Sequence, residues 1–165
     1  MPVMAKRSQP RRPAPPSPGV AHGEYVVYPG TRAEVYDLLE RLSEAAGDSP
    51  DSGTTGLSLD RTRVTVRWFG ELPNRVRRVV DAAGDGLTVV VAATEFRPGD
   101  LRAEAIRLAA EHPDVVAAAS ARPEGDGIEL LVLPAVAEAA GGAEQALAGV
   151  ASGFPLFAEI GEPGS

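Results

Sequence analysis

The fold is decided by residues 57–93, LSLDRTRVTVRWFGELPNRVRRVVDAAGDGLTVVVAA. In the first part of this stretch, Val64, Val66 and Trp68 occupy even positions, and the odd positions from 61 to 67 are Arg or Thr. Alternation with a period of two predicts a strand that has one buried and one solvated face. Because Trp68 has the parity of the two valines, we expect its side chain in the core.

A helix and a second strand are predicted directly after this strand. Pro73 suits the first turn of a helix, where a missing N–H costs nothing, and Val76 begins an apolar stripe at helical spacing. The Gly-containing turn at 84–86 ends the helix. The apolar, β-branched run at 87–93 is typical of a strand covered on both faces. Residues 57–93 therefore predict a β-α-β unit.

Turn signals and periodicity predict further elements of the same kinds beyond residue 93. These are a helix from Asp100 to His112-Pro113, hairpin strands at 114–121 and 127–134, a helix broken at Gly141-Gly142, and a strand at 154–161. The expected order after residue 57 is β-α-β-α-β-β-α-β. We therefore expect an α/β (α+β) fold with a mixed sheet of split β-α-β units covered by helices.

The chain before residue 57 is expected to form two simpler segments. Residues 1–22 contain six prolines and no aromatic residue, so we expect a disordered, basic, Pro-rich arm. Residues 23–56 predict a short strand, a helix that opens with a capping box at Thr31 and stops at Gly47, and a flexible connection. The remaining residues, 57–165, form the expected α/β domain.

The composition excludes several classes of site. The 165 residues include no Cys and only two His, which excludes disulfides, thiolate nucleophiles and Cys-based metal sites. The chain has no nucleophile elbow, P-loop, dinucleotide fingerprint or calcium loop. We therefore expect no enzyme activity, no cofactor and no metal. A small carboxylate-based enzyme stays open, because carboxylates that converge in space leave no sequence signature.

No segment of the sequence predicts contact with a membrane or export. There is no apolar run of the roughly 20 residues that a membrane span needs, and the N-terminal residues have charges without an apolar stretch. We therefore expect no membrane association and no signal peptide. The default compartment for such a chain is the cytoplasm.

The net charge of −7 is unevenly distributed along the chain. Residues 1–22 carry four basic residues and no acid, and residues 61–80 carry six Arg against one Glu. The candidate interaction residues are Arg61, Arg63 and Arg67 on one strand face, and Arg75 and Arg78 on one side of the following helix. If the two surfaces adjoin, they form a positive patch for phosphates or an acidic protein surface; the alternative is pairing with nearby acids. Nucleic acid is not expected, because the body of the chain is acidic.

The segment VTVRWFGELPNRVRRVVDAAG carries the pattern Trp-x-Gly-x-x-Pro-x-x-Val at Trp68, Gly70, Pro73 and Val76. With the elements that follow, over residues 57–163, it is similar to the pro-region of actinobacterial secreted trypsin-like serine proteases of the alpha-lytic protease type. The resemblance implies a non-catalytic α/β module that binds a protein through sheet-edge and C-terminal-tail contacts, assists its folding and then inhibits it. The four motif residues are then structural. No protease domain follows in this sequence, so we expect a stand-alone module with a separate partner.

The sequence is therefore compatible with two functions. The first is a non-enzymatic protein-binding module that resembles a protease pro-region and uses the edge of its sheet or its Arg face. The alternative is a structural or assembly component, such as a virion or tail protein, whose arm at residues 1–22 orders on a neighbouring subunit. The second function implies a homo-oligomer or larger assembly and location in a virion.

Overall fold

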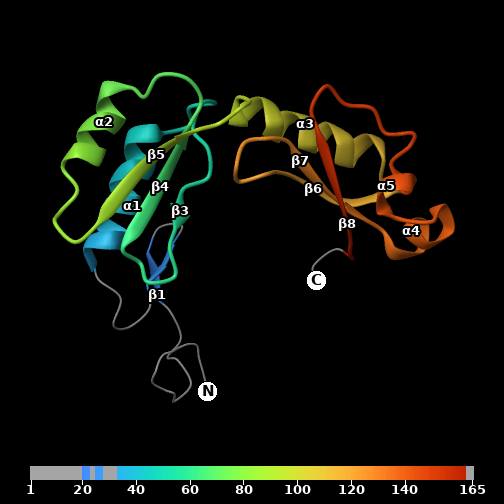
Figure 1. Cartoon of the computed structure of the whole chain (residues 1–165), viewed down its shortest axis with the longest axis horizontal. Helices are drawn as coiled ribbons and strands as arrows, with labels where there is room; N and C mark the ends of the chain where they lie inside the picture. Colours follow the sequence, from blue (N-terminus) through green and yellow to red (C-terminus); the bar gives the residue numbers. More distant parts are fainter. Residues whose placement is uncertain (1–19, 23–24, 28–32, 163–165) are drawn as a thin grey trace, which may run out of the picture.

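The computed structural model of the chain describes residues 20–22, 25–27 and 33–162 (Figure 1). It is a mixed α/β structure, and the order of elements expected after residue 57 is confirmed. The strands form two three-stranded sheets instead of one, together with a two-stranded pair. This pair consists of β1 (Val20–His22) and β2 (Tyr25–Val27), which are antiparallel. Most of the expected arm, and Thr31 of the capping box, lie outside the described residues.

The first lobe holds one three-stranded sheet and two helices. Its elements are α1 (Ala33–Ala46), β3 (Gly56–Leu57), β4 (Arg63–Trp68), α2 (Asn74–Asp81) and β5 (Thr88–Ala93). Helix α1 ends at Gly47, whose φ of +59° lies in the left-handed region that glycine adopts easily. The buried face of α1 meets Val64, Val66 and Trp68 of β4. The alternation of the sequence therefore sets which face of β4 is covered by helices.

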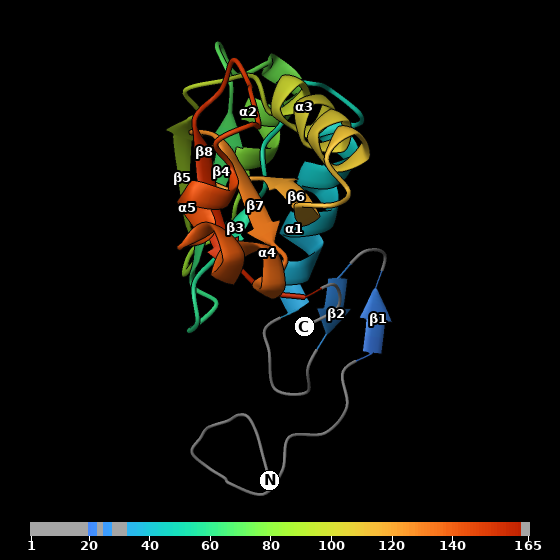
Figure 2. The same ribbon diagram turned by 90° about the vertical axis from the view of Figure 1, so that its right-hand side faces the viewer.

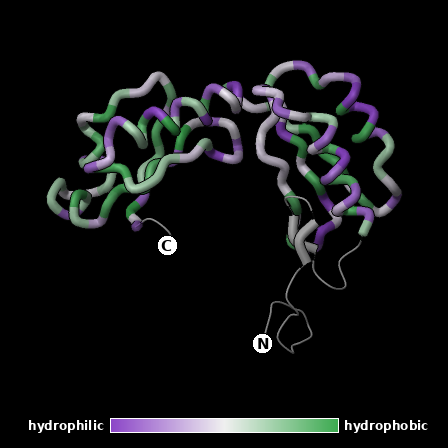
Figure 3. Tube along the Cα trace, turned by 180° about the vertical axis from the view of Figure 1, so that it is seen from behind, coloured by the Kyte–Doolittle hydropathy of each residue, from purple (hydrophilic) through white to green (hydrophobic). Residues whose placement is uncertain are grey.

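The second lobe holds the other three-stranded sheet. Its elements are α3 (Pro98–Glu111), β6 (Val116–Ala121), β7 (Ile128–Val132), α4 (Pro134–Ala140), α5 (Ala143–Ala146) and β8 (Leu156–Ile160). The expected break between α4 and α5 is confirmed at Gly141 and Gly142, which have φ of +92° and +148°. Helix α3 packs on the sheet through Leu101, Ala105 and Leu108. In Figure 3 the helices alternate between green and purple segments, as expected for helices with one buried side.

The two lobes repeat the same arrangement of elements. Each starts with a helix, continues with an antiparallel hairpin (β3–β4 or β6–β7), and ends with a parallel crossover (β4 to β5 or β7 to β8). In both lobes the middle strand buries alternate residues. The chain is therefore an internal repeat of an α-β-β-α-β unit, and each copy has its own cluster of buried residues.

The division into two sheets corrects the expectation for residues 87–93. A strand covered on both faces was expected there, but β5 lies at the edge of the first sheet and Val91 is 38% exposed. The β-branched run therefore predicted the strand correctly and its burial wrongly.

A few polar contacts join the lobes. The N–H of Gly99 donates to the carbonyl of Pro50 at 2.7 Å, and the N–H of Phe96 donates to the carbonyl of Gly125 at 3.1 Å. The guanidinium of Arg97 pairs with Asp51 at 2.7 Å. Residues 50–54, expected to be a flexible connection, therefore contact the start of α3. Among the described residues, no helix has the length and apolarity that crossing a membrane requires.

Candidate functional site

The structure separates the five Arg that the sequence singled out. Arg63 and Arg67 lie on the face of β4 opposite Val64 and Val66, whereas α1 and α2 pack on the valine face. Arg75 and Arg78 belong to α2, so the sheet lies between them and the strand arginines. The two surfaces do not adjoin, so the condition for a continuous positive patch is not met.

Arg61 is not part of the strand face. The carboxylate of Asp60 accepts hydrogen bonds from the hydroxyls of Ser58 and Thr62, both at 2.7 Å, and closes a turn between β3 and β4. Arg61 sits in this turn with φ of +59° and lies near the hydroxyl of Tyr36. The same hydrogen bonds lower the pKa of Asp60 to about 2, and the bond from Ser58 has the largest effect. The turn splits the strand expected from Leu57 onward into β3 and β4.

Two of the other arginines serve the fold locally. A guanidinium nitrogen of Arg67 donates to the carbonyl of Thr54 at 3.0 Å, and Nε of Arg75 donates to the carbonyl of Ala45 at 2.6 Å. These partners are backbone carbonyls of the first lobe and not the acids that the alternative interpretation expected. They fix the segment before β3 and the end of α1.

The residues of the Trp-x-Gly-x-x-Pro-x-x-Val pattern occupy structural positions. Trp68 is 2% exposed and Val76 is 1% exposed, and both belong to the core of the first lobe. Gly70 has φ of +80°, and Pro73 is the N-cap residue of α2. The pattern therefore describes a strand, a left-handed turn and a helix start.

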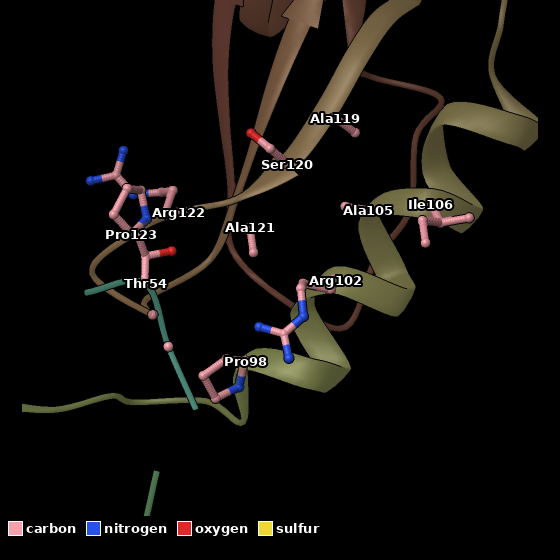
Figure 4. Close-up of a pocket in the computed structure, with 12 residues that line it drawn as sticks. Thr54, Pro98, Arg102, Ala105, Ile106, Ala119, Ser120, Ala121, Arg122 and Pro123 are labelled. Carbon is pink, nitrogen blue, oxygen red and sulfur yellow. The ribbon is translucent and has the colours of Figure 1, made fainter. Parts of the chain in front are cut away.

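A groove of about 370 Å³ lies between α3 and β6 (Figure 4). It is bordered by one side of α3, the free edge of β6, the hairpin turn that follows β6, and the segment before β3. The residues that line it are Gly53, Thr54, Pro98, Arg102, Ala105, Ile106, Ala119, Ser120, Ala121, Arg122, Pro123 and Gly125. The groove therefore combines residues of both lobes.

Strand β6 is an edge strand, with β7 on one side only (Figure 2). The N–H of Arg122 donates to the carbonyl of Gly127 at 2.9 Å, so its backbone groups face β7. Because backbone groups alternate in direction along an antiparallel strand, those of Ala121 and Ala119 point away from β7. In the described part of the chain, no backbone hydrogen bond joins them to another segment. β6 therefore presents an unpaired row of donors and acceptors at the groove.

The side chains around the groove leave room for a further strand. Ala119 and Ala121 are small, and the facing positions of α3 include Pro98, Ala105 and Ile106. Ile106 is 72% exposed, which is unusual for a large apolar side chain beside a cavity. A strand added to β6 would lie about 4.8 Å from it, and its side chains would contact this apolar side of α3.

The charge of the groove is opposite to that of the protein. Its lining includes Arg102 and Arg122 and no acidic residue, whereas the whole chain has a net charge of −7. Arg122 pairs with Asp126 at 2.8 Å and stacks on the ring of Phe157, with 3.9 Å from its guanidinium carbon to the ring centroid. The hydrogen bond to Asp126 raises the pKa of Arg122. Because Arg122 is paired with Asp126, the attraction of the groove for anionic groups comes mainly from Arg102.

A second polar cluster ties the outer side of α3 to the segment before β8. The carboxylate of Glu104 accepts hydrogen bonds from Arg107 at 2.7 Å and from the hydroxyl of Ser152. These bonds lower the pKa of Glu104 to about 2, and the bond from Arg107 has the largest effect. Arg107 also donates to the carbonyl of Ala151 at 3.1 Å. The cluster stabilises the packing of the second lobe and does not contribute to the groove lining.

Glu104→Gln is expected to lower the free energy of unfolding at pH 7 by about 1–2 kcal/mol, because it weakens a charge-assisted network. A carboxylate whose pKa is lowered on folding stabilises the native state above its ordinary pKa of 4.5, and this stabilisation is lost as the pH falls toward 2. The variant should therefore differ most from the parent at neutral pH and least at pH 2.5. Urea unfolding followed by circular dichroism at pH 7, 4 and 2.5 measures this. Glu138→Gln, at an exposed position of α4, is the control, and equal effects of both substitutions would contradict the prediction.

No group of three or more His, Cys, Asp or Glu side chains in the described ranges is arranged to hold a metal ion. His112 is the residue that follows the last turn of α3, and Glu124 and Asp126 both pair with Arg122. Comparison of the chain with models of protein families, with curated proteins and with solved structures finds no match in any of the three. The groove between α3 and β6, a cavity beside the free edge of β6, is the candidate site.

The sequence alone did not predict this groove. Its walls come from three stretches that are distant in the chain: the segment before β3, α3, and β6 with the turn that follows it. One local signal was present: Ile106 falls four residues after Arg102, on the polar side of a helix whose apolar side is already occupied by Leu101, Ala105 and Leu108.

Proposed function

We propose that the chain is a non-enzymatic protein-binding module that binds an extended segment of its partner by strand addition to β6. The observation that carries this proposal is the free edge of β6, whose outward backbone groups face a groove walled by α3. Strand addition gives affinity through main-chain hydrogen bonds and specificity through pockets for alternate side chains. The free edge of β6 offers the main-chain hydrogen bonds, and the groove offers space for the side chains.

The repeat within the fold supports the choice of β6 over the equivalent edge of the first lobe. The strand in the equivalent position is β3, which contains only two residues, whereas β6 contains six. The residues before β3 also bond to β4, since the N–H of Gly53 donates to the carbonyl of Arg67 at 2.9 Å. An added strand therefore finds a longer edge at β6.

The resemblance to protease pro-regions supports the same class of function. In that family, a non-catalytic α/β module uses a sheet edge to contact a separately active protein, assists its folding and then inhibits it. We extend this role to the chain, with a partner that is a separate protein. The assembly function depends on the arm at residues 1–22, most of which lies outside the described residues, and it stays a prediction.

Ala121→Pro tests the proposal, because proline removes one outward N–H of β6 and places its ring where an added strand would pair. We expect peptides selected from a random decapeptide display library on the parent protein to lose at least about tenfold in affinity for this variant. Their binding should also slow hydrogen exchange at the amides of Ala119 and Ala121. Fluorescence anisotropy and hydrogen exchange measure the two effects.

Ala158→Pro is the matched control for this experiment. Ala158 lies in β8, at the opposite edge of the same sheet. The N–H of Ile128 donates to the carbonyl of Pro155, so residues 155, 157 and 159 face β7 and Ala158 faces outward. The control therefore introduces the same proline in an equivalent backbone position. Failure to select any peptide, or equal losses in both variants, would contradict the proposal.

A further inference from the structure

We infer that the segment bound in the α3–β6 groove is acidic, with a side-chain carboxylate that pairs with Arg102. This inference builds on the proposed function and names the chemistry of its ligand. The ligand class is an extended peptide with an internal Asp or Glu between small apolar side chains. Three observations lead to this assignment. Arg102 lacks a carboxylate partner among the described residues, its guanidinium is oriented in the groove, and alternate side chains of an added strand would point toward α3.

Arg102 is the exception among the arginines of residues 81–165. This part of the chain contains four Arg and fourteen Asp or Glu, so acids are in large excess. Three of the arginines have a carboxylate partner at 2.7–2.8 Å: Arg97 with Asp51, Arg107 with Glu104, and Arg122 with Asp126. Within the described residues, Arg102 has no such partner. The one arginine of the second lobe without a carboxylate lines the groove.

The guanidinium of Arg102 is held in place by the first lobe. It donates to the carbonyl of Ser52 at 3.2 Å, from the segment that forms the groove wall opposite α3. A guanidinium has five N–H donors, so this bond leaves donors for a ligand. Figure 4 shows the side chain extending from α3 toward the side of the groove where Thr54 lies. A carboxylate would meet a partly oriented donor, as charge-assisted recognition requires.

The alternation of a strand sets the spacing of the ligand. An added strand pairs with the outward backbone groups of Ala119 and Ala121, and every second side chain points toward α3. A carboxylate that reaches Arg102 is then flanked, two residues away on each side, by side chains that contact the apolar lining. Ala105 and Ile106 favour small apolar groups there. The expected pattern is apolar-x-acid-x-apolar.

The test uses nonapeptides with blocked ends, acetyl-STVTXTVTS-amide, in which X is Glu, Gln or Lys. We expect the parent protein to bind the Glu peptide at least about tenfold more tightly than the Lys peptide, with Gln between them. Arg102→Glu should invert this order, because its carboxylate would attract Lys and repel Glu. A Gln peptide with a free C-terminal carboxylate should bind no better than the blocked Gln peptide, since the charge acts from a side chain. Fluorescence anisotropy at low and moderate salt measures the affinities.

Arg77→Glu is the control for the change in net charge. Arg77 is exposed on α2, away from the groove, so this variant should keep the order of affinities of the parent. If the peptides bind, and Ala121→Pro weakens them, but Glu, Gln and Lys peptides bind equally, the acidic ligand is wrong and strand addition stands. If no peptide binds, or Ala121→Pro has no effect, strand addition itself fails. A stable dimer in sedimentation that Ala121→Pro dissociates would assign the groove to a second copy and overturn the inference.

Discussion

Leu130→Ala is expected to unfold the second lobe at a lower urea concentration while the first lobe stays folded. Leu130 is 0% exposed and lies in the middle of β7 within the core of the second lobe. Removing a buried leucine side chain costs about 2–5 kcal/mol, through lost transfer free energy and the cavity that remains. For a lobe of this size, such a loss removes most of the stability.

The two lobes should respond separately because their buried clusters share no residue. The described contacts between the lobes include backbone hydrogen bonds, the Arg97–Asp51 pair and the hydrogen bond from Arg102 to the carbonyl of Ser52, and partly exposed ion pairs contribute little. Trp68 is the only Trp of the chain and is buried in the first lobe, so its fluorescence reports that lobe alone. Far-ultraviolet circular dichroism reports the secondary structure of both lobes.

The measurement is urea unfolding of Leu130→Ala, followed in parallel by Trp68 fluorescence and circular dichroism. We expect an early transition in circular dichroism without a matching change in fluorescence. Leu38→Ala is the matched variant, since Leu38 is also 0% exposed but lies in the core of the first lobe, and it should move the fluorescence transition. If Leu130→Ala shifts both signals together, the lobes unfold as one unit.

The helices and strands themselves were predictable because their signals are local. The parity of Val64 and Val66 set the buried face of β4, and the Gly141-Gly142 pair set the break between α4 and α5. Which strands pair with one another was not predictable. The run at 87–93 has the composition of a strand covered on both faces, but it forms β5 at the edge of the first sheet. Strand neighbours involve residues far apart in the sequence.

The candidate site was less predictable than the fold for the same reason. Arg charges close in sequence suggested a patch, but the sheet separates Arg63 and Arg67 from Arg75 and Arg78, and the turn at Asp60 removes Arg61 from the strand. Charge counts along a chain do not record which side of a sheet a residue occupies. The groove depends instead on the free edge of β6 and on contacts between the lobes.

Gly125→Ala is expected to lower the free energy of unfolding by about 3 kcal/mol, and to weaken peptide binding in the groove. Gly125 has φ of +74°, a left-handed conformation that costs about 1 kcal/mol for a residue with a Cβ. A Cβ at this position would overlap Cβ of Thr94 and lie 2.5 Å from its Cγ2. The left-handed backbone conformation and the overlap with Thr94 therefore both destabilise the variant.

Thr94 cannot easily move to relieve this overlap. It is 7% exposed, and its hydroxyl donates to the carbonyl of Phe96 at 2.8 Å. The N–H of Phe96 in turn donates to the carbonyl of Gly125 at 3.1 Å, which closes a small network at the junction of the lobes. Displacing Thr94 would break this network and shift the hairpin turn that borders the groove. Stability and binding should therefore be lost together.

Urea unfolding of Gly125→Ala and of the control Gly149→Ala separates the overlap from the general effect of adding a methyl group. A Cβ at Gly149 would meet nothing within 4 Å, so this control should change stability by less than about 0.5 kcal/mol. In a Thr94→Gly background the overlap is absent, and Gly125→Ala should cost only the roughly 1 kcal/mol of the left-handed conformation. An equal cost in both backgrounds would show that Thr94 does not hold the hairpin turn in place. The groove would then owe its shape to other contacts between the lobes.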